Sequence, residues 1–477
     1  MGSKFKQISL VLFGVLAGVL LSLNFSAVAQ REEARYPLPV DELRAFAEVY
    51  GAIKTGYVEP VEDKKLITEA INGMLAGLDP HSAYLDQEAF KELQVGTQGE
   101  FGGLGIEVGM EDGFVKVVSP IEDTPAFRAG LKPGDLIIKL DDTPVKGMTL
   151  GDAVKRMRGK PKTAIRLTIV RKGAAQPFEV TVVRDVIRVQ SVKSKIIEPG
   201  YGYLRISQFQ EHTGENLVKH LNELYKDGQL KGLVLDLRND PGGLLNGAVG
   251  VSSAFLPRDA IVVTTDGRTE DAKRKYAATP VDYLRGRGED YLKDLPAGVK
   301  TVPMVVLVNG GSASASEIVA GALQDYKRAT VMGTQSFGKG SVQTIMPLKN
   351  NTAIKLTTAR YYTPSGRSIQ AKGITPDVEV QEPGAPRDRI READLIKHLQ
   401  GTEEEAQSKQ EGSAPAQKTG EEPRDSGSAP TKPIVLGGPD DFQLKQALNH
   451  LKGLPVIAKL EEPVQQAGSA QAAATKK

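Results

Sequence analysis

Apolar side chains recur at helical spacing in residues 30–97. They are Leu43, Phe46, Val49, Tyr50 and Ile53 in a first run, and Leu66, Ile67, Ile71, Leu75 and Leu78 in a second. Spacings of three and four residues predict two amphipathic helices, the second of which ends at Asp79-Pro80. Because two short helices cannot bury both of their faces alone, we expect this segment to dock on another domain or on a second subunit.

From about residue 98 the pattern changes to short β-type runs separated by glycines. These runs lie at 102–108, 114–118, 136–140 and 165–170, with one helix predicted near 150–158. In a second region, 185–382, residues 233–237 and 304–308 are almost entirely apolar, which is typical of parallel strands buried on both faces. We therefore expect a β-rich module at 98–184 and the largest core, an α/β domain, at 185–382.

The C-terminal part loses this patterning and then regains it. Residues 383–438 form a low-complexity linker in which 401–433 contain almost no large apolar residue, so we expect disorder there. Helical periodicity returns at 441–451, within a segment 439–477 that we interpret as a C-terminal helix and a polar tail.

The first 29 residues have the pattern of a signal peptide. Lys4 and Lys6 precede an apolar run over 8–23, and small residues follow up to Ala29. The pattern predicts cleavage after Ala29 and export to the periplasm or the cell envelope. An uncleaved inner-membrane anchor is the alternative, because the apolar run approaches the roughly 17–20 residues of a membrane span.

Length, charge and cysteine content limit the classes of protein that this chain can belong to. The 477 residues are enough for two or three domains. A formal net charge of +2 gives no field that would suggest a nucleic-acid partner. The chain has no cysteine, which excludes disulfides, a thiolate nucleophile and a cysteine-ligated metal.

A run of small residues joins the apolar stretch 304–308 to a predicted helix. The run reads Asn309-Gly310-Gly311-Ser312-Ala313-Ser314-Ala315-Ser316-Glu317. A hydroxyl at this junction would lie over a helix N-terminus, whose unpaired N–H groups stabilise developing negative charge, as an acyl-transfer nucleophile requires. The letters Ser314-x-x-Glu317 also fit a capping box, which begins many helices that do no chemistry. The local sequence leaves both interpretations open.

A lysine, rather than a histidine, is the candidate base. None of the five histidines carries a local signature of a catalytic triad, although His212 stays open beside its interpretation as a surface-loop histidine. Lys339, in contrast, lies among glycines in Phe337-Gly338-Lys339-Gly340. A lysine accepts a proton near neutral pH only if its pKa falls by about three units from roughly 10.4, which burial can supply. A hairpin turn with a solvated lysine is the alternative. Gly340 after the lysine excludes a Walker-type phosphate loop.

The serine run and residues 337–343 together resemble the carboxyl-terminal processing peptidases, also called tail-specific proteases. In that family a lysine follows the serine by 25 residues and a glutamine follows the lysine by four, which implies Ser314, Lys339 and Gln343 as the catalytic residues here. The resemblance implies no metal and no cofactor.

The family's strand ending in Asp-Leu-Arg-x-x-Pro-Gly-Gly is also present, as residues 236–243. Glycines after a buried strand can direct N–H groups at a developing oxyanion. The resemblance therefore implies an oxyanion hole built from the Ala315 N–H with that of Gly242 or Gly243, and the sequence does not choose between the two glycines.

The β-rich module resembles a circularly permuted PDZ domain over its whole length. The resemblance rests on the order of Gly103-Leu104-Gly105-Ile106, Thr124-Pro125-Ala126 and residues 129–135. It implies that Leu104, Gly105 and Ile106 hold the carboxylate of a substrate's C-terminus, and that Arg158, at the end of the module's helix, acts as a regulatory sensor. Taken alone, the glycine run fits an ordinary turn before a strand better than it fits a carboxylate-binding loop.

The expected architecture is a multidomain α+β protein: a helical N-terminal segment, a circularly permuted PDZ domain, a ClpP/crotonase-like α/β peptidase core, and a C-terminal helix after a disordered linker. The expected function is that of an exported serine endopeptidase with a Ser-Lys dyad, acting on proteins or peptides with apolar C-termini. A homodimer through the N- and C-terminal helices and an envelope adaptor are further hypotheses about partners.

Two rival functions come from other classes. One is a catalytically inactive PDZ scaffold that binds protein C-termini. The other is a crotonase-type enzyme that acts on a thioester, against which the export signal and the PDZ module argue.

Overall fold

The structure is a computed structural model, and it describes residues 38–121, 123–286, 288–383, 390–401 and 435–458. The expected signal peptide and most of the expected linker lie outside these residues. Among the residues described, no helix combines the length and the apolar character that a membrane span requires. The chain divides into two units, residues 1–71 and 72–477, and each is described by itself.

The first unit contains the two predicted helices, α2 (Val40–Gly56) and the larger part of α3 (Asp63–Ala76). Lys54 pairs with Asp63 at 2.7 Å and donates to the Val61 carbonyl at 2.6 Å, which closes the turn between the helices. No residue of α2 is buried. The apolar positions that predicted the helix, Phe46 and Val49 among them, are therefore exposed in this single chain.

In the second unit, the β-rich module has a sheet of order β3-β4-β5-β7-β8, with β6 added to β5. Its elements are β3 (Ile106–Glu111), β4 (Phe114–Pro120), α5 (Pro125–Arg128), β5 (Leu136–Leu140), β6 (Thr143–Pro144), α6 (Leu150–Met157), β7 (Ala164–Val170) and β8 (Phe178–Val183). Alternate side chains such as Val115 and Val117 point into a closed apolar core. Strand β3 pairs only with β4 among the described strands, so its outer edge is open.

A two-stranded ribbon of β2 (Glu100–Gly103) and β9 (Asp185–Arg188) carries the chain into and out of this module. The sequence predicted one strand over 102–108, but the structure has two, β2 and β3. Gly105 separates them because its backbone turns at a φ of +79°, a conformation that strand residues do not adopt.

The largest core contains a six-stranded sheet of order β10-β11-β12-β15-β16-β19, parallel except for β10. Its strands are β10 (Val192–Glu198), β11 (Tyr201–Ile206), β12 (Gly232–Asp236), β15 (Met304–Val308), β16 (Thr330–Gly333) and β19 (Val378–Glu379). Every residue of β12 and β15 is buried, as their apolar runs predicted.

A second sheet of order β1-β18-β13-β14, with β17 on β18, completes this region. Its strands are β1 (Ala83–Leu85), β13 (Ile261–Gly267), β14 (Arg274–Ala277), β17 (Ser341–Pro347) and β18 (Ala353–Tyr362). Further helical elements of the second unit are α4 (Gln87–Gln98), η1 (Glu270–Ala272), α9 (Pro280–Tyr283), η2 (Tyr291–Asp294), η3 (Ala297–Lys300), η4 (Lys349–Asn351) and η5 (Glu392–Asp394).

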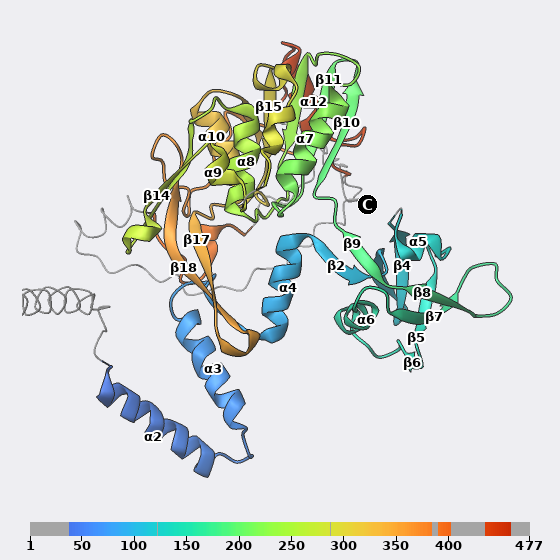
Figure 1. The fold of residues 1–477 in the computed structure, drawn as a ribbon, viewed down its shortest axis with the longest axis vertical. Coiled ribbons are helices and arrows are strands. Elements are labelled where there is room, and N and C mark those ends of the chain that lie inside the picture. The colour runs from blue at the N-terminus through green and yellow to red at the C-terminus, as the bar shows by residue number, and fades with distance from the viewer. Residues whose placement is uncertain (1–37, 122, 287, 384–389, 402–434, 459–477) are drawn as a thin grey trace, which may run out of the picture. The chain divides into compact units, whose positions relative to one another are not determined.

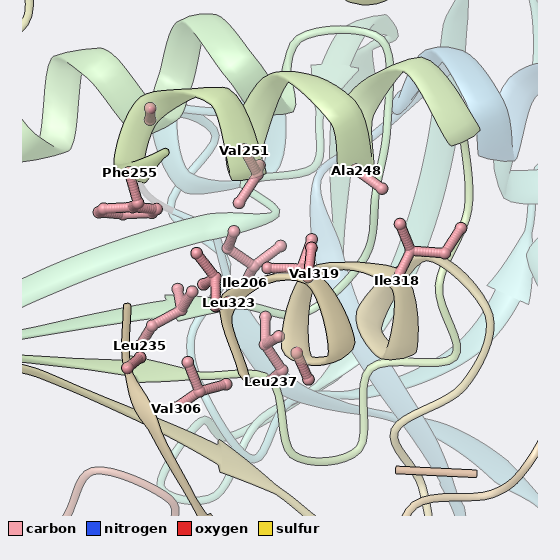
Figure 2. Close-up of a cluster of buried hydrophobic side chains, with 14 of the residues drawn as sticks. Ile206, Leu235, Leu237, Ala248, Val251, Phe255, Val306, Ile318, Val319 and Leu323 are labelled. Carbon is pink, nitrogen blue, oxygen red and sulfur yellow. The ribbon is translucent and has the colours of Figure 1, made fainter. Parts of the chain in front are cut away.

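Helices cover both faces of the six-stranded sheet. The helices α7 (Thr213–Leu224), α8 (Leu245–Phe255) and α10 (Ala315–Asp325) pack on one face, and Figure 1 shows them beside β11 and β15. Figure 2 shows Leu235 and Val306 of the sheet in one buried apolar cluster with Val251 of α8 and Val319 of α10. Each such buried aliphatic side chain contributes roughly 1.5–3 kcal/mol, so the start of α10 is held firmly.

The opposite face of the sheet is covered by α12 (Phe442–Leu451), the predicted C-terminal helix. Leu444, Ala447 and Leu448 pack there against Val234 and Val305. The apolar face of α12 is therefore occupied within the chain, which removes it from the predicted dimer contact.

Residues 390–401, which the composition assigns to the linker, pack on the core instead. Glu392 is fully buried, and its N–H donates to the Phe337 carbonyl at 3.1 Å. The buried contacts of Glu392 are with polar groups, so hydrophobic patterning gives no sign of them.

Candidate active site

Ser314 lies at the junction of β15 and α10, in a strained backbone conformation. Its φ is +55° and its ψ is −111°, and it is half-buried at the N-cap of α10. Non-glycine residues adopt such positive φ values mainly where the surrounding structure imposes them, often at functional sites. The next residue, Ala315, begins the helix, so its N–H has no acceptor within α10.

The side chain of Glu317 holds this turn in place through hydrogen bonds. Its buried carboxylate accepts four hydrogen bonds from donors on two separate segments. The donors are the Ser336 hydroxyl at 2.6 Å and the Gly338 N–H at 2.7 Å on Oε1, and the N–H groups of Ser314 at 2.8 Å and Lys339 at 2.9 Å on Oε2. Burial raises the pKa of Glu317 to about 7, although all four donors favour the carboxylate. The capping residue Glu317 therefore holds the turn at Ser314 (the serine turn) next to the turn at Lys339 (the lysine turn).

Lys339 follows Gly338 in the segment that leads into β17, and it is half-buried. The pKa of its ammonium group is lowered mainly by burial and further by the positive charge of Lys355. The carboxylates of Glu392, Glu317 and Asp79 oppose this shift without reversing it. The environment thus makes the neutral amine easier to form than it is for a solvated lysine.

Gln343 belongs to a polar network along the β17–β18 hairpin. Its amide nitrogen donates to the hydroxyls of Ser341 and Thr357, each at 3.1 Å, and Thr357 in turn donates to Asp79 Oδ1 at 3.0 Å. The Ser82 hydroxyl donates to the other Asp79 oxygen at 2.7 Å. Asp79, which the sequence places at a helix end, and its neighbour Ser82 thus connect the N-terminal segment to this hairpin.

A second polar group joins the N-terminal segment to residues 390–401. His81 Nε2 contacts both carboxylate oxygens of Glu392, at 2.9 and 2.8 Å. Gln370 donates to Glu392 at 2.9 Å and accepts the Gly340 N–H at 3.0 Å, so the chain around the lysine is fixed on both sides. Within the described residues, no group of three or more His, Asp or Glu side chains is arranged to hold a metal ion.

The two glycines after β12 differ in where their N–H groups point. The Gly242 N–H donates to Asp240 Oδ1 at 2.8 Å. Phe209 pairs with Gly243 as in a parallel sheet, bonding to the Gly242 carbonyl at 2.9 Å and the Leu244 N–H at 2.8 Å. In this pattern the N–H of the central residue, Gly243, points away from Phe209.

Gly242 lies directly against the serine turn. A Cβ built on it would be 2.9 Å from the Ser314 Cβ and 2.8 Å from the Ala315 nitrogen, and its φ is +95°. Only glycine allows the backbone to approach the serine so closely. The structure therefore places Gly242 beside Ser314 and Ala315.

The predicted carboxylate-binding residues lie at the start of the open edge strand β3. Leu104 is buried, and its carbonyl accepts the Ala126 N–H at 2.9 Å. The Gly105 carbonyl accepts the Thr124 hydroxyl at 3.0 Å, and Ile106 is the first residue of β3. Arg158, the predicted sensor, is the C-cap of α6, and its guanidinium lies 4.7 Å from the centre of the Phe101 ring on β2.

Profiles of known families match three stretches of the chain. Residues 22–89 match the N-terminal domain of the activating protease CtpB, residues 102–182 match a PDZ domain, and residues 200–380 match peptidase family S41.

Individual proteins match over much of the chain. The carboxy-terminal-processing protease of Bartonella bacilliformis is 44% identical over 92% of this chain and 95% of its own length. The carboxy-terminal processing protease CtpB of Bacillus subtilis is 35% identical over 78% of this chain and 76% of its own. Among solved structures, a photosystem II D1 C-terminal processing protease is 30% identical, covers 72% of this chain and 88% of its own, and has a TM-score of 0.40.

Proposed function

The chain belongs to peptidase family S41, as a carboxy-terminal processing serine protease with a PDZ domain, and we propose that Ser314 is its nucleophile and Lys339 its general base. The observation that carries this proposal is the shared contact of both residues with Glu317 Oε2, at 2.8 and 2.9 Å. A surface cap would not need a buried carboxylate that also binds the lysine turn. The fully buried Glu317 therefore favours a catalytic over a purely structural serine turn.

The reaction begins with a neutral Lys339 amine. It takes the proton of the Ser314 hydroxyl while the serine oxygen bonds to the scissile carbonyl carbon. The resulting ammonium group then gives that proton to the departing amine, and the acyl-enzyme is left. Lys339 next removes a proton from water while the water oxygen bonds to the ester carbonyl carbon. The bond to the Ser314 oxygen then breaks, the ammonium group returns the proton to that oxygen, and the new C-terminus is released.

The carbonyl oxygen becomes an oxyanion in both steps. The Ala315 N–H at the start of α10 and the Gly243 N–H after β12 are the donors we assign to it. The Gly242 N–H is occupied by Asp240, so the role of Gly242 is to leave room for the serine turn. Each oxyanion donor is worth roughly 2.7–4 kcal/mol of barrier.

Gln343 would orient the lysine through its carboxamide oxygen. Its amide nitrogen is already bound to Ser341 and Thr357, so the oxygen is the atom that faces a new donor. A lysine ammonium is such a donor in the step between proton uptake and proton release.

The PDZ domain would hold the substrate's C-terminal tail. The open edge of β3 can pair with an extended peptide, while the N–H groups of Leu104, Gly105 and Ile106 meet its carboxylate. Because an apolar core lies beneath this edge, we propose apolar C-terminal residues as the preferred tails. Arg158, stacked on Phe101 of the ribbon β2–β9, would report tail binding to the rest of the chain.

Export, oligomerisation and an adaptor complete the proposal. A cleaved signal peptide would deliver the enzyme to the periplasm or the cell envelope, where it would process proteins or remove damaged ones. The exposed apolar positions of α2 support a homodimer through the N-terminal helices. An envelope adaptor remains a hypothesis from sequence.

The test combines active-site labelling with proteolysis. The mature protein is treated with a fluorophosphonate probe, and separately with an unfolded polypeptide that has an apolar C-terminus, alongside Ser314→Ala and Lys339→Ala. We expect both variants to lose labelling and cleavage. Ser365→Ala and Lys349→Ala, changes at exposed positions, serve as matched controls that keep both activities. Normal cleavage by Ser314→Ala or Lys339→Ala would exclude the dyad.

Amidation of the substrate's C-terminal carboxyl tests the tail-binding step. The amidated polypeptide should be cleaved more slowly by the parent enzyme, because it lacks the carboxylate that the PDZ loop, residues 104–106, is proposed to bind. Equal rates for the free and amidated tails would contradict recognition through that loop.

A further inference from the structure

The C-terminal helix α12 is connected to the active site by a fully buried arginine. The Arg238 guanidinium donates to Asp441 at 2.9 and 2.6 Å and to Asp236 at 3.0 and 2.7 Å. All three side chains are inaccessible to solvent. Two bidentate pairs on one guanidinium fix its position and orientation more strictly than a single ion pair does.

Asp441 also caps the N-terminus of α12. It is the N-cap of α12, and its oxygens also accept the Leu444 N–H at 3.0 Å and the Gly437 N–H at 2.7 Å. Gln443 adds an acceptor for Arg238 at 3.0 Å and donates to the Val380 carbonyl at 2.7 Å. The start of α12 is thus fastened both to Arg238 and to the end of β19.

Arg238 is itself part of the turn that leads to the glycine pair. The Asp240 N–H bonds to the Leu237 carbonyl at 3.3 Å, which closes a turn with Arg238 and Asn239 at its centre, and Asn239 has a φ of +54°. A turn with a non-glycine residue in this conformation depends on its surroundings to keep its shape. The side chain of Arg238 is therefore an anchor of the loop 239–243.

That loop is in turn bonded to the serine run. The Ser312 hydroxyl donates to the Leu237 carbonyl at 2.8 Å, and the Asp240 carbonyl accepts the Ser316 hydroxyl and the Ala313 N–H, both at 2.9 Å. A displacement of the turn would move the Gly243 N–H relative to Ala315. The two proposed oxyanion donors would then no longer converge.

We propose that Asp441 is a positioning residue for the peptidase reaction, acting through Arg238 on the loop 239–243, so that the contact between Asp441 and Arg238, rather than the apolar packing of α12, supports the rate of the chemical step. The inference rests on the oxyanion hole of the proposed function. By this inference α12 does more than cover the sheet, because it also helps to position the catalytic residues.

The test uses the full chain with Asp441→Asn. Asparagine keeps the helix cap and the shape of the side chain but removes the charge that holds Arg238. With a short peptide substrate, we expect kcat to fall by about tenfold or more while KM changes by less than about twofold, since the lost interaction acts in the transition state. The affinity for a peptide aldehyde, whose adduct with Ser314 carries an oxyanion, should fall in parallel.

Two controls separate positioning from general stability. Asp440→Asn makes the same chemical change at an exposed neighbour and should leave kcat unchanged. Leu448→Ala loosens the packing of α12 on the sheet without contacting Arg238, and at a similar loss of Tm it should reduce kcat much less than Asp441→Asn. Equal losses of kcat in the two variants would reduce Asp441 to a structural residue and overturn the inference.

If Asp441→Asn does not fold, Gln443→Met carries the test. It removes one acceptor of Arg238 and keeps the volume, so kcat should fall by about threefold at constant KM; an unchanged kcat would overturn the inference. Ser314→Ala is measured in parallel. Activity in Ser314→Ala would contradict the proposed function, whereas an inactive Ser314→Ala beside a fully active Asp441→Asn would contradict this inference alone.

Discussion

The backbone N–H groups of Ser314 and Lys339 donate to one atom, Oε2 of Glu317, at 2.8 and 2.9 Å. The two residues are far apart along the chain, yet one buried carboxylate fixes the backbone of both. The distance between Ser314 and Lys339 therefore depends on the Glu317 carboxylate, which takes no part in the proposed proton transfer. Four predictions follow from this arrangement and its surroundings.

Glu317→Gln should damage both stability and catalysis. An amide keeps one oxygen, but its NH₂ group must face at least one pair of donors, so buried N–H groups lose their acceptor. We expect the free energy of unfolding to fall by about 2–3 kcal/mol, and kcat to fall by about 100-fold or more as the dyad separates. Urea denaturation and turnover of a short peptide measure the two effects.

The matched control for that change is Glu270→Gln, which neutralises an exposed glutamate on η1. It should leave both quantities within error. A Glu317→Gln protein with the parent's kcat would mean that the shared carboxylate does not position the dyad.

Lys355→Met should shift the acidic limb of the pH profile. The positive charge of Lys355 helps to lower the pKa of Lys339. Removing it makes the protonated form of Lys339 less unfavourable, so that pKa rises and a higher pH is needed to form the neutral base. The limb of kcat/KM against pH should therefore move to higher pH. Lys349→Met, at an exposed site on the same hairpin, should not move it, and a shift of Lys355→Met to lower pH would contradict the assignment of the base.

Gly242→Ala should abolish activity through a collision as well as through backbone strain. The new Cβ would lie 2.6 Å from the Ala313 oxygen and 2.9 Å from the Ser314 Cβ. We expect kcat to fall by about 100-fold or more, because the serine turn must move away from the oxyanion donors. Peptide turnover measured on folded protein tests this.

Gly228→Ala separates the two effects. Gly228 also has a positive φ, +127°, but nothing lies within 4 Å of its Cβ position. This variant should lose about 1 kcal/mol of stability and keep its kcat. If the two alanine variants lost kcat equally, close packing at Gly242 would not be the cause.

Asp240→Asn should stabilise the protein in a pH-dependent way. Burial raises the pKa of Asp240 to about 7, and no donor in the described part of the chain reaches its Oδ2. Because the folded-state pKa lies above the unfolded one, near 3.8, the parent's stability from this group is complete below about pH 4 and is lost as the pH rises through 7.

Asparagine does not titrate, so Asp240→Asn should have a higher Tm than the parent at pH 8 and a smaller advantage at pH 5. Each kcal/mol gained corresponds to roughly 2–4 °C in Tm. Asp271→Asn, at an exposed aspartate, should show no such dependence. An advantage that is larger at pH 5 than at pH 8 would contradict a charged, buried Asp240.

Much of the fold follows from the sequence alone. Helical spacing predicted α2, α3 and α12, and the apolar runs at 233–237 and 304–308 predicted the buried strands β12 and β15. The family and the PDZ domain were also predicted from motifs and are confirmed. Periodicity and short motifs succeed here because each depends on neighbours within one element.

The different roles of Gly242 and Gly243 could not be predicted from periodicity and short motifs. Gly242 and Gly243 are adjacent and identical in type, and only the pairing with Phe209 and the bond from Gly242 to Asp240 tell their N–H groups apart. The same holds for Glu317. Its letters fit a capping box, and the sequence gives no sign that the carboxylate also binds the turn around Lys339.

What the sequence by itself determined is therefore several of the helices and strands, the family and the candidate nucleophile and base. The tertiary structure alone decided how distant polar groups meet, as Arg238 meets Asp441 under α12 and His81 meets Glu392 beside the lysine turn. The physical reason is that buried polar groups take partners wherever the folded chain supplies donors and acceptors, and hydrophobic periodicity carries no information about that choice.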